Sequence, residues 1–300
     1  MALKALRQLI VFLSGEREQT MEDAVLYVTA QGSRLTRVGE RMVVRTRDGK
    51  ILSDVPLFRI QQVICFGAVD VTHAALMGMA RRDVDLVFLT LEGRFKTRFS
   101  EHSPTAVRCR LKQYERASDQ SFRLAMARTV VCGKLQNCRT WLMRQNRSRD
   151  EEVGTQVHGL TVAVQNAARV NTVDEVMGWE GAGAKCYFDA LKSLFKQDLG
   201  FRGRVKRPPT DPVNAMLSFC YTLLFNRVLS AVQIAGLDPF LANLHGNEDR
   251  RPSLALDLME EFRPLLVDQV VMGLVNRMQV TVQDFFPVEG KGIRMKEGAL

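Results

Sequence analysis

The chain has 300 residues, 46% of them hydrophobic and 25% charged, which is enough for one large or two smaller globular domains with a real core. A net charge of +9 favours a polyanionic partner, nucleic acid before a membrane, because no compact basic amphipathic tail is present. The six cysteines are scattered without a C-x-x-C pair, which predicts reduced core thiols of a cytoplasmic protein.

The N-terminal stretch, residues 1–22, begins with a short apolar run. This run is too short to cross a membrane, and no cleavage signal follows it. We expect an amphipathic helical extension there. Since no other apolar stretch approaches membrane-spanning length, the sequence predicts a protein without a membrane segment.

Residues 23–103 have the pattern of a small β-rich domain. Apolar and polar residues alternate, with breaks at Gly32 and Gly39, and Asp48-Gly49 is a strong two-residue hairpin signal. Thr72 is the expected N-cap of one short helix. Because the domain has no acidic constellation, we assign dimerisation to it rather than chemistry.

A helical region begins after Pro104, where the apolar spacing changes from two to 3.6 residues. Residues 105–145 predict one long helix, or two that are broken near Gly133. The expected catalytic domain is this α-helical region, residues 104–280. The predicted fold class is therefore α+β, with a small N-terminal β-rich domain followed by a larger all-α catalytic domain.

A further helix is bracketed by its end signals. Asp211 is the expected N-cap, Pro212 occupies the first helical position, and Gly236 follows the end. At the C-terminus, residues 281–300 lose periodicity, and we expect a flexible tail.

A candidate metal site follows Gly236. The chain presents His245 in a polar loop and then enters a helix that carries Asp257 and Glu260, which are three apart and share a helix face. Carboxylates beside an imidazole suit Mg²⁺ or Mn²⁺. The alternative is structural, because acidic residues in a first helical turn also complement the helix dipole, and a lone histidine is often structural.

A second candidate carboxylate is Glu180, in the segment GWEGAGAKCYF. The glycines around it would allow a close approach of backbone, metal and substrate. Lys185 would neutralise a phosphate or be solvated. The alternative is a helix interior in which the small residues serve close packing.

The segment FRGRVKRPPTDP is a basic loop between two helices. It has no acidic residue among its cations, Arg202, Arg204, Lys206 and Arg207. Two consecutive prolines favour an extended backbone, which could track a phosphate chain. A merely solvated loop is the alternative.

Other catalytic signatures are missing. The sequence contains no GxxxxGK[ST], GxSxG or HExxH motif. The carboxylates, the histidine and the basic loop together favour metal-dependent phosphodiester chemistry.

Three segments, in their order and spacing, resemble the CRISPR-associated integrase of spacer acquisition, the larger catalytic subunit of the adaptation complex. They are GWEGAGAKCYF, RVKRPPTDPVNAMLSFCYTLL and GLDPFLANLHGNEDRRPSLALDLMEEFRP. The resemblance covers roughly residues 20–280. It implies that Glu180, His245 and Glu260 are catalytic and hold Mg²⁺ or Mn²⁺, with Asp257 as a supporting or alternate ligand. Some members have aspartate where this chain has Glu260.

The resemblance also implies the reaction and the partners. The expected assembly is a homodimer that joins a small adaptation partner subunit in a heterohexamer. It would hold a short DNA duplex and join its 3′-OH ends to a CRISPR repeat by transesterification. Two alternatives remain: a transposon-type integrase or structure-specific DNA nuclease outside a CRISPR system, and a DNA scaffold with a broken metal set.

Overall fold

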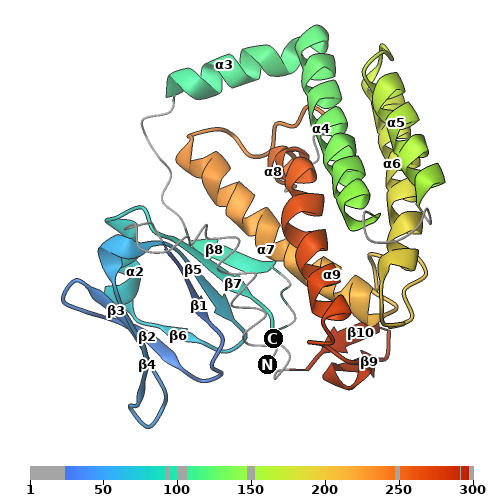
Figure 1. Ribbon diagram of the computed structural model, residues 1–300. Helices are drawn as coiled ribbons and strands as arrows, with labels where there is room; N and C mark the ends of the chain where they lie inside the picture. The colour runs from blue at the N-terminus through green and yellow to red at the C-terminus, as the bar shows by residue number, and fades with distance from the viewer. Residues whose placement is uncertain are drawn as a thin grey trace. The chain divides into compact units, whose positions relative to one another are not determined.

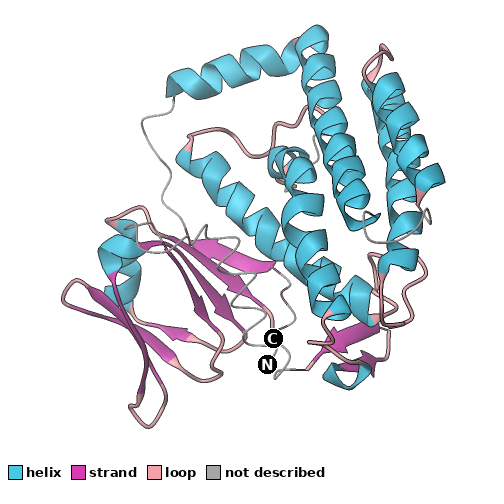
Figure 2. Cartoon of the chain, viewed as in Figure 1, coloured by secondary structure: helices cyan, strands magenta, loops and turns pink. Residues whose placement is uncertain are grey.

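The computed structural model describes residues 24–246 and 251–296, except residues 92, 94, 100–106, 147–152 and 291. The expected helical extension at residues 1–22 lies outside them, as does Pro104. The described residues form two compact units, 24–99 and 107–296. Strands make up most of the first and helices most of the second (Figure 2), so the predicted α+β class is confirmed. The dimerisation role of the first unit stays a prediction.

The first unit contains two four-stranded sheets, with strand orders β1-β5-β7-β8 and β4-β3-β2-β6. Within the first sheet β1, β5 and β7 are parallel and β8 is antiparallel to β7. The elements, labelled in Figure 1, are β1 (Ala24–Val28), β2 (Arg34–Val38), β3 (Arg41–Arg45), β4 (Ile51–Pro56), η1 (Leu57–Arg59), β5 (Ile60–Phe66), β6 (Asp70–Val71), α2 (His73–Ala80), β7 (Asp85–Leu89) and β8 (Phe95–Phe99).

Local signals account for the turns of this unit. Asp48-Gly49 joins β3 to β4, and Gly49 has a φ of +88°, which only glycine adopts easily. Thr72 caps α2 by accepting a hydrogen bond from Ala75 N at 3.3 Å. The cap is confirmed. The hairpin is confirmed too, but its loop is longer than the two residues expected, because Thr46 N donates to Lys50 O at 2.9 Å and three residues lie between them.

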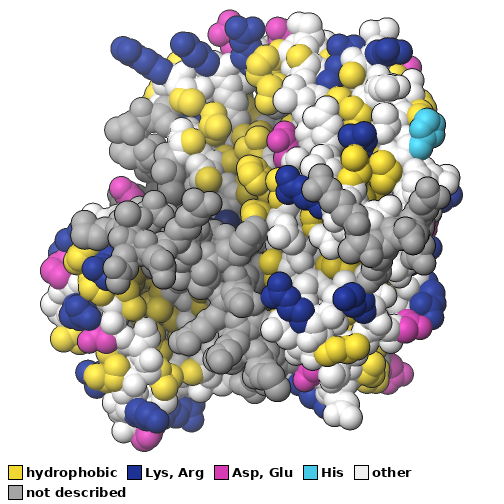
Figure 3. Space-filling model, in the orientation of Figure 1, with side chains coloured by type: hydrophobic (Ala, Val, Ile, Leu, Met, Phe, Trp, Pro, Cys, Tyr) yellow, Lys and Arg dark blue, Asp and Glu magenta, His cyan; other side chains and the backbone are white. Residues whose placement is uncertain are grey.

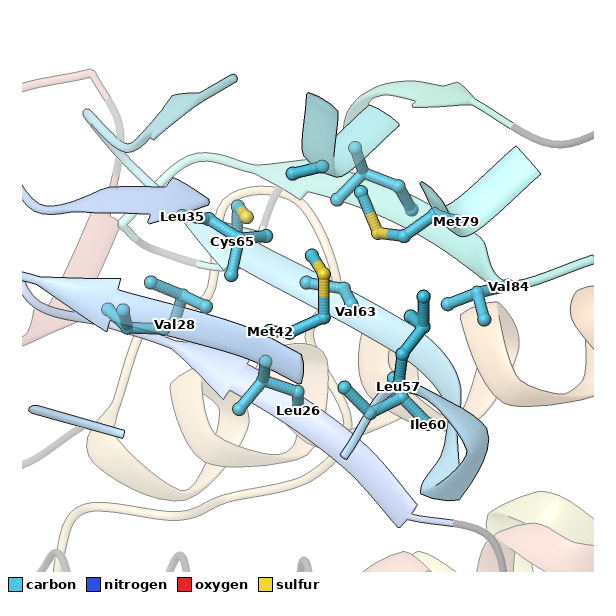
Figure 4. Packing of buried hydrophobic residues seen from close by; sticks show 13 residues of the cluster. Leu26, Val28, Leu35, Met42, Leu57, Ile60, Val63, Cys65, Met79 and Val84 are labelled. Carbon is cyan, nitrogen blue, oxygen red and sulfur yellow. The ribbon is translucent and has the colours of Figure 1, made fainter. Parts of the chain in front are cut away.

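The core of the first unit combines side chains from both sheets and from α2. Figure 4 shows Leu26 and Val63 from one sheet near Met42 from the other, with Met79 of α2 in the same cluster. These side chains are almost completely buried. β1 turns alternate residues inward, as the period of two predicts, whereas the central strands β5 and β7 are buried along most of their length.

The second unit is built mainly from helices, shown as coils in Figure 1. They are α3 (Val107–Ser118), α4 (Gln120–Asn146), α5 (Gly154–Ala167), α6 (Val173–Leu194), α7 (Pro212–Ile234), α8 (Ser253–Met259), the 3₁₀ turn η3 (Glu260–Phe262), the π turn η4 (Arg263–Asp268), α9 (Gln269–Asn276), the 3₁₀ turn η5 (Val282–Asp284), and the strands β9 (Phe285–Val288) and β10 (Gly292–Met295).

The packing of α4 creates the frame for the site. It packs against α5 and α6, and it also contacts η3 and η4, while α7 packs against α8 and η4. Asp211 caps α7 by accepting from Asn214 N at 2.9 Å, and Pro212 is its first residue. The predicted start of this helix is confirmed.

The expected helix break near Gly133 is wrong. α4 continues through Gly133, and the break falls at Asp119, whose Oδ1 accepts from Ser121 N and Phe122 N at 2.9 and 3.2 Å. An aspartate cap therefore starts the second helix. Gly133 instead permits a close contact, since a Cβ there would lie 2.7 Å from Cδ of Glu261.

The expected flexible tail is also wrong for the described part of residues 281–300. β9 and β10 form an antiparallel hairpin, and Ile293 N donates to Pro209 O at 2.8 Å. Gly292 lies against the same carbonyl, because a Cβ there would be 2.2 Å from Pro209 O. Strands of four residues are too short to show a periodicity.

One helix contradicts the expectation that nothing approaches membrane-spanning length. In the described part of the chain, α7 is long and apolar enough by composition, over Pro212–Gln233. However, 61% of its most apolar window is buried within the protein. This burial is typical of a core helix, and α7 has that place in the second unit.

Two glycines of α6 are expected to respond oppositely to alanine. A Cβ at Gly183 would lie 2.5 Å from Cδ2 of Leu135, whereas a Cβ at Gly181 would meet nothing within 4 Å. Gly183→Ala should cost roughly 1–3 kcal/mol through overpacking, and Gly181→Ala should stabilise the helix by about 0.5–1 kcal/mol. Urea denaturation measures both, and equal effects would contradict this packing.

Candidate active site

A cavity of about 440 Å³ opens in the second unit, and the predicted site residues Glu180, His245 and Glu260 all line it. It is formed where α4, α6, α7, η3, η4 and two loops meet. The other lining residues are Lys134, Met177, Ala184, Lys185, Phe188, Asp189, Gly203, Arg204, Lys206, Tyr221, Leu244 and Arg263.

The loop that carries His245 is anchored by Asp257 of α8. The Asp257 carboxylate accepts from the backbone N–H groups of Asn243, Leu244 and His245 at 2.7, 2.8 and 3.1 Å. It also lies 2.7 Å from Nδ1 of His245. Because a carboxylate accepts, Nδ1 carries the proton and the lone pair of Nε2 remains for a ligand.

Asp257 is therefore a positioning residue in this structure. Asp257 is 2% exposed, and both of its carboxylate oxygens accept hydrogen bonds from the His245 loop. The geometry favours the supporting role predicted for it over that of an alternate metal ligand.

Glu260 opens η3, directly after α8, and is 4% exposed. Its Oε2 lies 2.5 Å from Nζ of Lys134, and its Oε1 lies 3.2 Å from Nη2 of Arg263. Burial raises the pKa of Glu260, but the charges of Lys134 and Arg263 outweigh it and hold this pKa below its usual value. Glu260 is therefore a buried carboxylate that two cations keep ionised.

Glu180 lies in the middle of α6, so the interpretation as a helix interior is confirmed, and its side chain also lines the cavity. Its role as a site residue stays a prediction. Its carboxylate accepts a hydrogen bond from Nζ of Lys134, which thus bridges Glu180 and Glu260. Of the nearby glycines, Gly183 serves packing against Leu135, while Gly178 and Gly181 face open space.

The donor chemistry of these residues fits a divalent metal. Two carboxylates and one imidazole nitrogen suit Mg²⁺ or Mn²⁺. Oε2 of Glu260 is buried and receives no hydrogen bond of good geometry, although the Lys134 ammonium is close. In the described ranges no three His, Cys, Asp or Glu side chains enclose a metal position; the Lys134 ammonium lies between two of the candidates instead.

A second buried cluster lies beneath the cavity, around Asp268 at the end of η4. Tyr187 OH donates to Oδ2 of Asp268 at 2.8 Å, and Tyr221 OH donates to Oδ1. Two guanidinium groups also lie over the Tyr221 ring, with Cζ of Arg204 at 5.4 Å and Cζ of Arg263 at 4.9 Å from the ring centroid. Cation–π contacts thus hold both arginines at the cavity wall.

The candidate DNA-binding residues differ in their exposure and in their contacts within the protein. Lys185 and Lys206 line the cavity, and Arg207 is exposed beside it in sequence. Arg204 is committed to internal contacts, with bonds to Asn214 Oδ1 and Ser218 Oγ at 2.8 and 3.1 Å.

Arg202 differs again, because it pairs with Asp198 at 3.1 Å in an exposed position. Figure 3 shows Lys and Arg side chains at several separate places on the face in view. The DNA contacts of all five residues stay predictions.

Sequence reasoning missed Lys134, Tyr221 and Arg263. A signal for Lys134 was available, since it is the only charged residue among the buried positions of α4. Those positions are Ala127, Val130, Val131, Lys134, Leu135, Cys138, Trp141 and Leu142. A lone lysine within an apolar stripe at helical spacing indicates a buried partner.

The stability of the protein should fall as Asp268 ionises. Burial raises the pKa of Asp268 to about 6, from a usual value of 3.8. The folded state therefore holds an extra proton between pH 4 and 6, so this group favours folding most at pH 4 and loses that contribution as pH rises to about 6. Asp268→Asn should remove this dependence.

The comparison is made by urea denaturation at pH 4.5 and 7.5. Relative to wild type, Asp268→Asn should gain roughly 2 kcal/mol on going from the lower to the higher pH, because about 1.5 pH units separate pH 4.5 from the folded pKa of about 6. If the unfolding free energies of wild type and variant differed by the same amount at both pH values, the raised pKa of Asp268 would be contradicted.

Comparisons with known proteins agree with this architecture. The family model described as CRISPR associated protein Cas1 matches residues 26–300. A CRISPR-associated endonuclease Cas1 from Chlorobaculum tepidum is 34% identical over an alignment of 282 residues that covers 91% of this chain and 82% of that protein. A CAS1 protein from Thermotoga maritima has a structure with a TM-score of 0.80 and 27% identity, over 92% of this chain and 85% of that one.

Two further solved structures share the fold. A casposase bound to integration product has a TM-score of 0.80 and 22% identity, over 92% of this chain and 79% of its own. A chain of a Cas6-RT-Cas1–Cas2 complex has a TM-score of 0.81 and 20% identity, over 95% of this chain and 32% of its own. At these identities the likeness is one of fold alone.

Proposed function

The chain belongs to the CRISPR-associated Cas1 family of endonucleases, and from this premise we propose that it is a metal-dependent DNA endonuclease and integrase of CRISPR adaptation. It joins the 3′-OH ends of short DNA duplexes to a CRISPR repeat by transesterification. The observation that carries this proposal is the convergence of Glu180, His245 and Glu260 on one cavity with basic walls.

In this proposal Glu180, Glu260 and Nε2 of His245 hold Mg²⁺ or Mn²⁺. A bound divalent ion would polarise the phosphate and stabilise the charge of the attacking and leaving oxygens. Asp257 orients the imidazole and fixes the tautomer that leaves Nε2 unprotonated.

Basic residues hold the DNA in this proposal. Lys185 and Lys206 bind phosphates from the cavity wall. Burial, and then the like charge of Arg263, lower the pKa of Lys206; Glu260 opposes this shift, and Lys134 and Arg204 add to it. This positive crowding favours an anionic ligand, because a phosphate would relieve it.

We propose the assembly on the same basis. The protein forms a homodimer that joins a small adaptation partner subunit in a heterohexamer and acts in the cytoplasm, without a membrane. A Cas1–Cas2 complex is among the structures that share its fold. Light scattering after size-exclusion chromatography, with and without that partner, measures both association steps.

A two-arm integration assay tests the function. Labelled short duplexes are incubated with Mn²⁺ or EDTA and a plasmid that carries a CRISPR repeat, with and without the small partner. The proposal expects Mn²⁺-dependent joining at the repeat that the partner stimulates. Joining without any need for repeat or partner would favour the transposon-type alternative, and no joining in either arm would refute the proposal.

The salt dependence of DNA binding should identify the phosphate contacts. Changing Lys206 and Arg207 together to alanine should reduce the slope of log affinity against log salt by about 0.9 per lost contact on duplex DNA. Arg169→Ala is the control and should leave the slope unchanged, because Arg169 is exposed after α5 and does not line the cavity. An unchanged slope in the double variant would mean that this loop is only solvated.

A further inference from the structure

Lys134 occupies an unusual position on the buried face of α4. Lys134 is 8% exposed, and its neighbours on the buried face of α4 are apolar. A buried ammonium is strongly unfavourable unless anions compensate it. The compensation comes from Glu180 on α6 and Glu260 on η3, which are far apart in the sequence.

The ammonium of Lys134 and the carboxylates of Glu180 and Glu260 stabilise each other's charged forms. Burial lowers the pKa of Lys134, but the carboxylates of Glu260 and Glu180 outweigh it and raise this pKa above its usual value. Arg263 adds a second cation to Glu260, at 3.2 Å. The two carboxylates are thus already neutralised by side chains of the protein.

We propose that Lys134 is an internal counter-cation that competes with the divalent metal for the carboxylates of Glu180 and Glu260. The inference rests on the proposed function, because it concerns the same two ligands. A metal ion and an ammonium require the same oxygens and repel each other at such distances. Metal binding therefore requires the ammonium to leave the bridge.

The structure provides a place for the displaced ammonium. Lys134 lines the cavity, so its flexible four-carbon stem can turn toward this space. There it would join Lys185 and Lys206 on the basic wall. The competition lowers the apparent metal affinity, and it stabilises the acidic cluster in the metal-free protein.

A purely structural role of Lys134 makes the opposite prediction. If Lys134 only positions Glu180 and Glu260, its removal should misplace the ligands and weaken metal binding. Competition instead predicts tighter binding when the ammonium is removed. The direction of the change in affinity therefore separates the two roles.

The test is a Mn²⁺ titration of the full-length protein, followed by the electron paramagnetic resonance signal of free Mn²⁺ and by thermal denaturation. Lys134→Met should lower the apparent Kd by about tenfold or more, because an opposing charge is removed. It should also lower the Tm without metal and increase the Tm rise on adding Mn²⁺. Lys196→Met is the control and should bind within about threefold of wild type, because Lys196 is exposed and does not line the cavity.

A second variant covers the case in which Lys134→Met does not fold. Lys134→Arg keeps the charge but offers a planar group that binds carboxylates in two-bond pairs, so it should bind Mn²⁺ more weakly than wild type. Unchanged or weaker binding by Lys134→Met, or unchanged binding by Lys134→Arg, overturns the inference. If wild type itself binds no Mn²⁺, the proposed metal chemistry fails together with it.

Discussion

Replacing His245 with alanine is expected to lower Mn²⁺-dependent strand transfer by about two to four orders of magnitude, the usual cost of removing a central catalytic group. The imidazole is the only nitrogen donor proposed for the metal, and its Nδ1 is engaged by Asp257. The fold should survive, since the side chain of His245 is 25% exposed. The integration assay and the Tm measure the two effects separately.

His158→Ala provides a matched control for this loss. His158 is exposed on α5 and does not line the cavity, so its removal should leave strand transfer unchanged. Near-normal transfer by His245→Ala would show that this histidine has no part in the chemistry. A fall in both variants would indicate a general loss of folded protein instead.

Asp257→Asn should have the second-largest effect, on activity and on stability. The amide would present N–H groups to a place where three backbone N–H groups and Nδ1 of His245 already point. We expect a loss of about 1–3 kcal/mol in unfolding free energy from the unpaired donors. Activity should fall by about 10–100-fold, as is usual when a group that orients a metal ligand is lost.

The readout that identifies a positioning role is the Mn²⁺ affinity of Asp257→Asn. It should weaken together with activity, because His245 is no longer held in one tautomer. Asp189→Asn, at the edge of the same cavity and paired with Lys192 at 2.7 Å, is the control and should change neither quantity appreciably. A lower Tm with normal Mn²⁺ affinity would reduce Asp257 to a purely structural residue.

The parts of the fold that the sequence predicted are those determined by neighbours along the chain. Thr72 and Asp211 cap their helices through bonds to backbone groups three residues away. Asp48-Gly49 makes its turn by its own backbone preferences. The break at Asp119 is also made by a local cap, in which its carboxylate accepts from backbone N–H groups. The sequence pointed to Gly133 instead, because a glycine inside a helical pattern can either end the helix or allow close packing, as it does here.

The parts that could not be predicted depend on contacts between distant segments. The hairpin β9–β10 is held by Pro209, and the bridge of Lys134 joins residues 46 positions apart in the case of Glu180. No local pattern encodes such a pairing. The similarity to a known family supplied Glu180, His245 and Glu260 as a set, whereas only the structure shows that Asp257 holds the histidine loop.

The π turn η4 has a consequence for the length of the chain around the site. A π turn closes its hydrogen bond over five residues rather than four, so it holds one residue more than an α-helical turn. The extra residue is absorbed within this one turn, so the helix after it keeps the direction that an uninterrupted α-helix would give it. If the same residue were accommodated in an ordinary α-helix, everything after it would rotate by about 100°. Glu260 would keep its place, but Asp268 would turn away from Tyr187 and Tyr221. The π turn therefore lets Glu260 and Asp268 both reach their partners although the segment between them is one residue longer than an α-helix would allow.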